Sequence, residues 1–211
     1  DCFDSDLGYQ GRGQFMLSIR NSDFADQSKS NGFESDNDGN GTDVKPNTFP
    51  VYSNVTLIGP YQTQSTDANE LFQNGVKVDK RSRLSLFNSV VMGWEYGVRI
   101  DGKTTVENYE GTDNEGQMRH NIIAGWRRGT PAAPGAVAVS SAEGGLGSTF
   151  EAVPWLMASA FQNDTIYLNT DVMLTDPYNT TAPNPMPMSG SPVLSGADFS
   201  HSYLQDGFFE S

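Results

Sequence analysis

The sequence predicts an all-β chain made of stacked coils or of propeller blades, and three observations favour this class. Three segments share the form Asn, short apolar strand, Gly, and they begin 34 and 33 residues apart, at Asn54, Asn88 and Asn121. Trp94 and Trp126 follow the last two of these glycines. No matching helical pattern lies between the segments. A near-constant period with one strand in each unit is typical of repeat folds. Ordinary antiparallel strands of a β-sandwich are the alternative.

The corners of such coils explain the two residue types, Asn and Gly, that recur in the three segments. In a parallel coil, an Asn at the same corner of each turn can hydrogen-bond its neighbours above and below. The Gly supplies a sharp exit turn that a side chain would block. We therefore expect Asn54, Asn88 and Asn121 to share one column.

The other elements follow in chain order. Apolar and polar residues alternate over Gln14–Arg20 and predict a strand with one apolar face. Gly97–Ile100 and Thr104–Glu107, joined by an Asp-Gly turn, predict a hairpin. Pro154–Phe161 begins with a proline, has apolar residues on one face, and is the only helix expected.

Composition divides the chain into three parts. Residues 1–128 hold the coils and an acidic loop. Residues 129–148 are rich in Gly, Ala, Pro and Ser and predict a loop. Residues 149–211 predict the short helix and a Pro-rich tail that wraps the same domain as extended, irregular chain. Because the chain begins at Asp1 and stops in an aromatic-rich segment, we expect a fragment of a longer protein.

Charge and residue counts exclude several classes of function. There are 26 acidic and 13 basic residues, a formal charge of −13, which disfavours nucleic acid and anionic membranes as partners. The apolar runs are far shorter than the roughly 20 residues of a membrane span. Cys2 is the single cysteine, so an internal disulfide or a Cys-rich zinc site is excluded. Two histidines, His120 and His201, are too few for a histidine zinc site.

An acidic segment has the spacing of a calcium loop. Asp36, Asp38 and Asn40 alternate before Gly41, as in the first half of such a loop, but the twelfth position is Asn47 instead of a bidentate Glu. An upstream Glu or a downstream Asp could supply the missing carboxylate. The candidate metal ligands are Glu34, Asp36, Asp38, Asn40 and Asp43. Calcium is the cofactor that this pattern indicates, and an empty solvated turn explains it equally well.

The same carboxylates suggest a second chemistry. Glu34, Asp36 and Asp38 could share one face of an extended strand, and paired carboxylates serve glycoside hydrolysis. In calcium-assisted cleavage of acidic polysaccharides a basic residue removes a proton beside the metal. Basic residues cluster between residues 81 and 128, among them Arg99 and Arg119, and a solvated face or partners for carboxylates are the plainer interpretation.

Aromatic side chains offer a possible carbohydrate contact. Flat indole faces suit sugar rings, so Trp94 and Trp126 are candidates, with Arg99 and Arg119 as polar contacts. Buried packing after each Gly is the commoner role for such tryptophans.

Three runs carry a resemblance to a known family: Phe3–Gly11, Asn31–Gly39 and Pro50–Pro60. They resemble the C-terminal half of a family of secreted, Bacteroidetes-type right-handed parallel β-helix proteins, many of which carry a type IX secretion sorting domain or a lipid anchor. The resemblance implies a right-handed parallel β-helix whose earlier coils are missing, and an extracellular or outer-surface location. It transfers no catalytic residue.

Three functions are consistent with these observations. The first is a non-enzymatic surface protein, a scaffold or adhesin that contacts polysaccharide or a cell-surface glycan and is stiffened by calcium. The second is a calcium-assisted polysaccharide lyase or a glycoside hydrolase. The third is a structural subunit of a cell-envelope assembly, with envelope proteins as its partners. Because the sequence contains no recognisable catalytic constellation, it favours the first.

Overall fold

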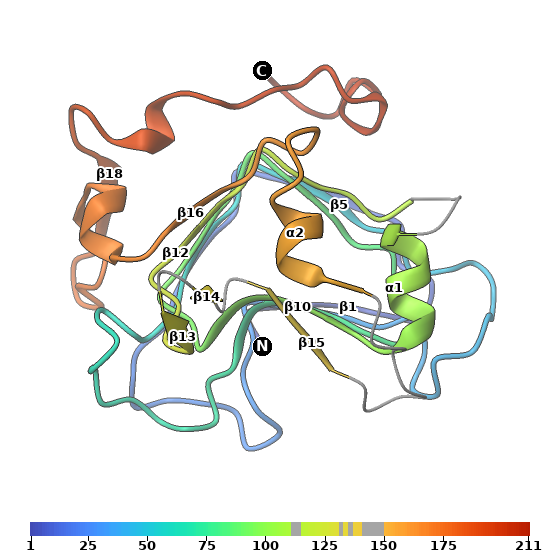
Figure 1. Cartoon of the computed structure of the whole chain (residues 1–211), viewed down its shortest axis with the longest axis horizontal. Coiled ribbons are helices and arrows are strands. Elements are labelled where there is room, and N and C mark those ends of the chain that lie inside the picture. The colour runs from blue at the N-terminus through green and yellow to red at the C-terminus, as the bar shows by residue number, and fades with distance from the viewer. Residues whose placement is uncertain (111–114, 131–132, 135–136, 141–149) are drawn as a thin grey trace.

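The protein is a parallel β-helix. The computed structural model describes residues 1–110, 115–130, 133–134, 137–140 and 150–211. Three parallel sheets run along the stack of coils and enclose one core, as the view down the stack shows (Figure 1). Each of the first four coils gives one strand to each sheet. This arrangement confirms the stacked coils predicted from the period and excludes the β-sandwich and the propeller.

The three sheets are named A, B and C in the order in which each coil passes through them. Sheet A contains, in spatial order, β1 (Phe3–Ser5), β4 (Phe33–Ser35), β7 (Asn74–Val78), β10 (Tyr96–Asp101) and β15 (Val137–Ser140). Sheet B contains β2 (Arg12–Gln14), β5 (Val51–Ser53), β8 (Ser85–Phe87) and β11 (Met118–Arg119). Sheet C contains β3 (Leu17–Ile19), β6 (Thr56–Ile58), β9 (Val90–Met92), β12 (Ile122–Ala124) and β16 (Asp164–Ile166).

The core consists of columns of inward side chains in register. Sheet A contributes Phe33, Val76 and Val98 to one such column. Tyr52, Leu86 and Met118 do the same from sheet B, and Leu57, Val91 and Ile123 from sheet C. All of these side chains are buried, and the Phe33 and Tyr52 rings stack with centroids 4.5 Å apart. Because every strand is only a few residues long, this stacking across coils provides the cooperativity that one coil lacks.

The corner between sheets B and C is two residues long in each of the first four coils, and its first residue is left-handed. Phe15, Asn54, Asn88, His120 and Gln162 have φ between 53° and 57°. The register places His120, and not Asn121, beside Asn88, so the expected column was displaced by one residue at its third member.

The residue that follows the left-handed corner residue forms the ladder. Asn121 Oδ1 accepts a hydrogen bond from the Ser89 N–H (3.0 Å), and Asn163 Oδ1 accepts from the Asn121 N–H (2.9 Å). The Ser89 hydroxyl accepts from the Val55 N–H at 3.0 Å. A side-chain ladder therefore exists, but of the three predicted asparagines it contains Asn121 alone, and its side chains bond to the backbone of the preceding coil.

The corner between sheets C and A matches the expectation from the glycines. Gly59, Gly93 and Gly125 follow strands that are in register, and Gly93 has φ +72°, where an L side chain is strained. Trp94 and Trp126 come next in their coils and are 0% and 2% exposed. The two indoles therefore pack inside the core, as the alternative interpretation of these tryptophans proposed.

Two predicted elements were wrong. Gln14–Arg20 is not one strand, because the left-handed Phe15 separates β2 from β3, and this first coil leaves Phe15 and Leu17 exposed. Thr104–Glu107 is not the second strand of a hairpin but part of helix α1 (Lys103–Glu110). The helix buries Thr105, Val106 and Tyr109, a spacing that places them on one face.

The remaining elements lie around the stack. Helix α2 (Ala152–Leu156) begins two residues before the predicted helix and covers only its first three residues, and Leu156 is buried in the core. The described part of residues 129–148, expected as a loop, holds β13 (Gly129–Thr130), β14 (Ala133–Pro134) and β15; the rest of that segment lies outside the described residues. Within the described chain, neither α-helix is long and apolar enough to cross a membrane.

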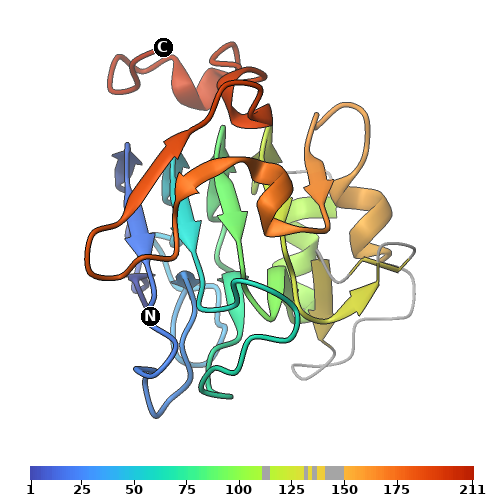
Figure 2. The same cartoon turned by 90° about the vertical axis from the view of Figure 1, so that its left-hand side faces the viewer.

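The tail wraps the body, as predicted from its prolines. It contains the 3-10 turns η1 (Asn169–Val172), η2 (Pro192–Leu194) and η3 (Ser202–Leu204), and an antiparallel pair, β17 (Leu174–Asp176) and β18 (Asn184–Pro187). In Figure 1 the tail, coloured orange to red, follows the outside of two sides of the triangular section, and Figure 2 shows it lying across the strands.

Candidate functional site

The tail covers the outer faces of sheets B and C. On sheet C, the outward side chains of Ile58 and Met92 pack against Val172 and Leu174 of the tail. On sheet B, Val51 and Phe87 pack against Leu204. The outer face of sheet A carries charged side chains instead, and the tail does not run along this side in Figure 1. This face is therefore the part of the helix wall on which polar chemistry is gathered.

The first charged column on this face changes sign along the stack. The register aligns Asp4 on β1, Glu34 on β4, Lys77 on β7 and Arg99 on β10. Neighbouring strands of a sheet lie about 4.8 Å apart, so consecutive members can interact directly. The Lys77 ammonium lies 2.6 Å from Glu34 Oε1 and 3.5 Å from Asp79 Oδ2.

A second column lies two residues further along each strand and consists of carboxylates. By continuation of the same register it contains Asp6, Asp36, Asp79 and Asp101. Asp79 and Asp101 are only 5% and 6% exposed. Burial of charged groups requires partners. Asp79 is paired with Lys77, as described above, and Arg99 Nε lies 3.2 Å from Asp101 Oδ2. In the same column, Lys80 Nζ lies 2.9 Å from Asp36 Oδ2.

These contacts shift the proton affinities on the face. Partial burial and the neighbouring charges of Asp6, Glu34 and Asp36 raise the pKa of Asp4. Burial acts to lower the pKa of Lys77, but its hydrogen bond to Glu34 and the charges of nearby carboxylates outweigh burial and raise it. The hydrogen bond to Asp36 raises the pKa of Lys80. Both lysines are therefore held in their charged form, whereas the ionised form of Asp4 is disfavoured relative to a free aspartate.

The five predicted metal ligands do not converge in the structure. Glu34 and Asp36 lie on sheet A and pair with lysines, whereas Asp43 pairs with Lys45 at 2.9 Å in the following loop. Asp38 Oδ1 accepts hydrogen bonds from the N–H groups of Asn40 (2.8 Å) and Thr42 (3.0 Å). Among the described residues, no three Asp, Glu, His or Cys side chains form a group that could hold a metal ion. Calcium binding stays a prediction.

The four predicted carbohydrate contacts separate into buried and outward residues. Because the indoles of Trp94 and Trp126 are buried, neither offers a ring face to a sugar. Arg99 lies in the first charged column of sheet A. Arg119 lies on β11, donates from Nη1 to the Ala160 carbonyl at 2.7 Å, and stacks over the Phe161 ring at 4.8 Å. Of the four, Arg99 alone lies on the charged face.

Several residues of the charged face were missed by the sequence reasoning: Asp4, Asp6, Lys77, Asp79, Lys80 and Asp101. The signal that unites them is their shared position in the coil. It is not visible as a period, because Phe3, Phe33, Val76 and Val98 occupy equivalent positions but are unequally spaced along the chain. An aspartate directly after an apolar, a charged and an apolar or small residue, as at Asp36, Asp79 and Asp101, is the pattern that could have found them.

The comparison with protein families agrees with this architecture. Residues 1–123 match the family described as a pectate-lyase-like β-helix domain. The chain belongs to this family. The matched residues contain the first four coils almost completely, and hence both charged columns of sheet A. No curated protein and no solved structure matches the chain.

Proposed function

We propose that this pectate-lyase-like β-helix domain is a carbohydrate-binding module of an extracellular or outer-surface protein, and that it contacts polysaccharide through the outer face of sheet A. One observation carries the proposal: the tail covers the other two outer faces, and sheet A keeps charged columns in register. The location rests on the family resemblance of the sequence.

The chemistry of the face suits a linear sugar polymer. Each column repeats a charged or hydrogen-bonding group at every coil, about 4.8 Å apart. Lys77 and Arg99 can pair with uronate or sulfate groups, and carboxylates such as Glu34 can accept hydrogen bonds from sugar hydroxyls. The ammonium and guanidinium groups already lie beside carboxylates, so a ligand would exchange partners with groups that are held in place and would not order free side chains.

A pair of charge-matched variants tests the proposal. Arg99→Gln and Lys103→Gln each remove one positive charge, but Arg99 lies on the face and Lys103 is an exposed residue of α1 that pairs with Glu107. We expect affinity electrophoresis with neutral, uronate-containing and sulfated polysaccharides to show retardation of the wild type by at least one class. Arg99→Gln should weaken that retardation about tenfold more than Lys103→Gln, and thermal melts would confirm that both variants are folded. Absence of binding to all three classes, or equal effects of the two variants, would contradict the proposal.

A second candidate function is hydrolysis or elimination on the same face. The observation that favours it is the raised pKa of Asp4, because general acids of glycosidases are carboxyls whose pKa is raised by their surroundings. Reducing ends and unsaturated products would be measured after incubation with the same polymers. Activity should be lost in Asp4→Asn and kept in Asp164→Asn, which changes an exposed carboxylate on sheet C. If the wild type forms no product from any polymer, this candidate is excluded.

A further inference from the structure

The last part of the tail forms a strap across the coils, which we call the C-terminal clasp and define as residues 196–210. It runs from the fourth coil back to the first. His120 Nδ1 donates to the Gly196 carbonyl at 3.0 Å. In the third coil, Asn88 Nδ2 donates to the Asp198 carbonyl (3.0 Å) and Asn88 Oδ1 accepts from the Asp198 N–H (2.9 Å).

The clasp reaches the first coil through a second double hydrogen bond. Gln14 Nε2 donates to the Glu210 carbonyl (2.7 Å), and Gln14 Oε1 accepts from the Glu210 N–H (2.9 Å). Arg12 Nε pairs with Asp206 Oδ2 at 2.9 Å. Side chains of the coils thus make the hydrogen bonds to the clasp backbone that a neighbouring strand would otherwise make. The clasp is held on the coils in this way without being a strand of the β-helix.

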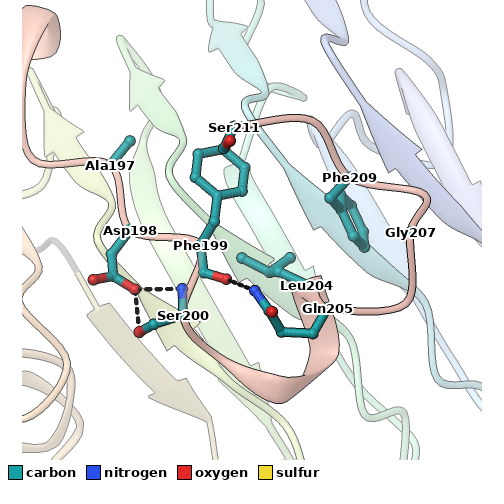
Figure 3. A pocket seen from close by; sticks show the side chains of 9 residues that line it. All are labelled: Ala197, Asp198, Phe199, Ser200, Leu204, Gln205, Gly207, Phe209 and Ser211. Carbon is teal, nitrogen blue, oxygen red and sulfur yellow. Dashed lines mark hydrogen bonds between the residues drawn. The ribbon is translucent and has the colours of Figure 1, made fainter.

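Apolar contacts hold the middle of the clasp. Leu204 is 3% exposed and packs with Val51 and Phe87 of sheet B. Figure 3 shows Leu204 and Phe209 beside an open surface pocket of about 480 Å³ that is lined by residues of the clasp and Ser211. The clasp therefore combines a buried anchor, Leu204, with an open pocket beside it.

His201 occupies a position in the clasp that only its neutral form can keep. Its Nδ1 accepts a hydrogen bond from the Tyr203 N–H at 3.2 Å and caps η3. Its ring lies 5.0 Å from the Phe87 ring and 4.7 Å from the Tyr203 ring, centroid to centroid. A proton on Nδ1 would remove the acceptor and oppose the Tyr203 N–H.

The surroundings of His201 also oppose its charge. Burial and the nearby Arg119 lower the pKa of His201, and Asp198 partly offsets them. The Tyr203 side of the site also contains the Arg83–Glu115 ion pair. His120, by contrast, donates from Nδ1 to a carbonyl and can do so in its neutral or its charged form.

We propose that the C-terminal clasp is an acid-sensitive latch, in which protonation of His201 releases residues 196–210 from the outer face of sheet B and uncovers Val51 and Phe87. The direction of the pH effect follows from thermodynamic linkage. A histidine whose pKa is lowered in the closed state stabilises that state at pH values above its ordinary pKa of about 6.5. This stabilisation is lost as the pH falls through 6.5 toward the closed-state pKa. Each unit of difference between the His201 pKa values of the open and closed states corresponds to about a tenfold change in the closing equilibrium.

Hydrogen exchange of the full chain tests the latch, with protection factors corrected for the intrinsic pH dependence of exchange. Between pH 7.5 and 5, we expect protection of residues 196–210 to fall at least tenfold in the wild type while protection of the coil strands is unchanged. His201→Asn keeps a side-chain acceptor at the cap but does not titrate, so its clasp should stay protected at both pH values. His120→Asn is the matched control, because Asn already occupies this left-handed corner at Asn54 and Asn88; it should open in acid like the wild type.

Two results would overturn the proposal: equal clasp protection at both pH values in the wild type, or the same loss of protection in acid in His201→Asn. Proton NMR of the wild type provides a test that needs no variant, because the chain has only two histidines. The His201 ring resonances should titrate below the ordinary histidine pKa, together with resonances of the clasp. If His201 titrates while the clasp resonances stay fixed, the latch is excluded.

Discussion

At the scale of single residues, one glycine fixes the start of the tail on the coils. Gly125 has φ +57°, and a Cβ built there would lie 2.0 Å from Asn169 Oδ1. The Asn169 amide donates to the carbonyls of Tyr61 (2.8 Å) and Gln62 (3.1 Å), which follow β6 of the second coil. The absence of a side chain at one corner thus lets the tail dock, and this contact places the covering of sheet C.

We expect Gly125→Ala to lower the free energy of unfolding by about 1–3 kcal/mol, because it adds both backbone strain and a clash. Urea unfolding would measure the change. Gly39→Ala is the matched control, since a Cβ there meets no atom within 4 Å. Equal effects of the two substitutions would contradict the docking role of Gly125.

The carboxyl of Asp4 shows how the charged face acts on stability. Its pKa is raised by burial and by three neighbouring carboxylates, so its ionised form is disfavoured in the folded state. We expect Asp4→Asn to raise the melting temperature at pH 7. The difference should shrink as the pH falls toward 3.8, where Asp4 of the wild type is itself protonated. A series of melts from pH 7 to 3.5 measures this, and a difference that grows in acid would be the opposite of the expected sign.

At the scale of elements, the sequence was informative where the coil geometry is constant. The corner between sheets B and C always has two residues in the first four coils, and β6, β9 and β12 begin 34 and 32 residues apart, so the period was visible there. Sheet A strands are separated by loops of unequal length, which hide their common pattern. The charged face was therefore predicted only at Glu34, Asp36 and Arg99, whereas its other members needed the register of the structure.

Helix α1 illustrates a different limit. Its sequence contains two threonines and a valine, which favour strands, and it follows an Asp-Gly pair typical of a hairpin turn. Tertiary contacts decide the outcome. Thr105 Oγ1 accepts from the Arg81 N–H at 3.0 Å, and the Tyr109 hydroxyl donates to the Leu84 carbonyl at 2.6 Å. The helix forms because it covers the core beside sheets A and B, not because its residues favour helix.

We expect Tyr109→Phe to lower the free energy of unfolding by about 1–2 kcal/mol, because the buried Leu84 carbonyl loses its donor and the ring volume is kept. Thermal or urea unfolding measures the loss. Tyr9→Phe removes a hydroxyl from a side chain that is 45% exposed and should change stability little. A Tyr109→Phe variant as stable as Tyr9→Phe would show that packing alone holds α1 in place.

At the scale of the whole molecule, the tail gives the three outer faces different roles. The prolines predicted that residues 149–211 would wrap the body, but they could not predict which sheets would be covered. That choice depends on outward apolar side chains such as Ile58, Met92 and Phe87, which are indistinguishable in sequence from inward ones. Sheet A lacks such a stripe and presents charge, and this contrast is the basis of the proposed binding face.

Carboxyl footprinting with and without a bound polysaccharide shows whether sheet A is the binding face. Labelling of exposed carboxylates by a carbodiimide and an amine would be quantified residue by residue. We expect polysaccharide to protect Asp4, Asp6 and Glu34 on sheet A and to leave Asp164 and Asp171, on sheet C and the tail, labelled as before. Protection of Asp164 and Asp171 with no change at Asp4, Asp6 and Glu34 would contradict it.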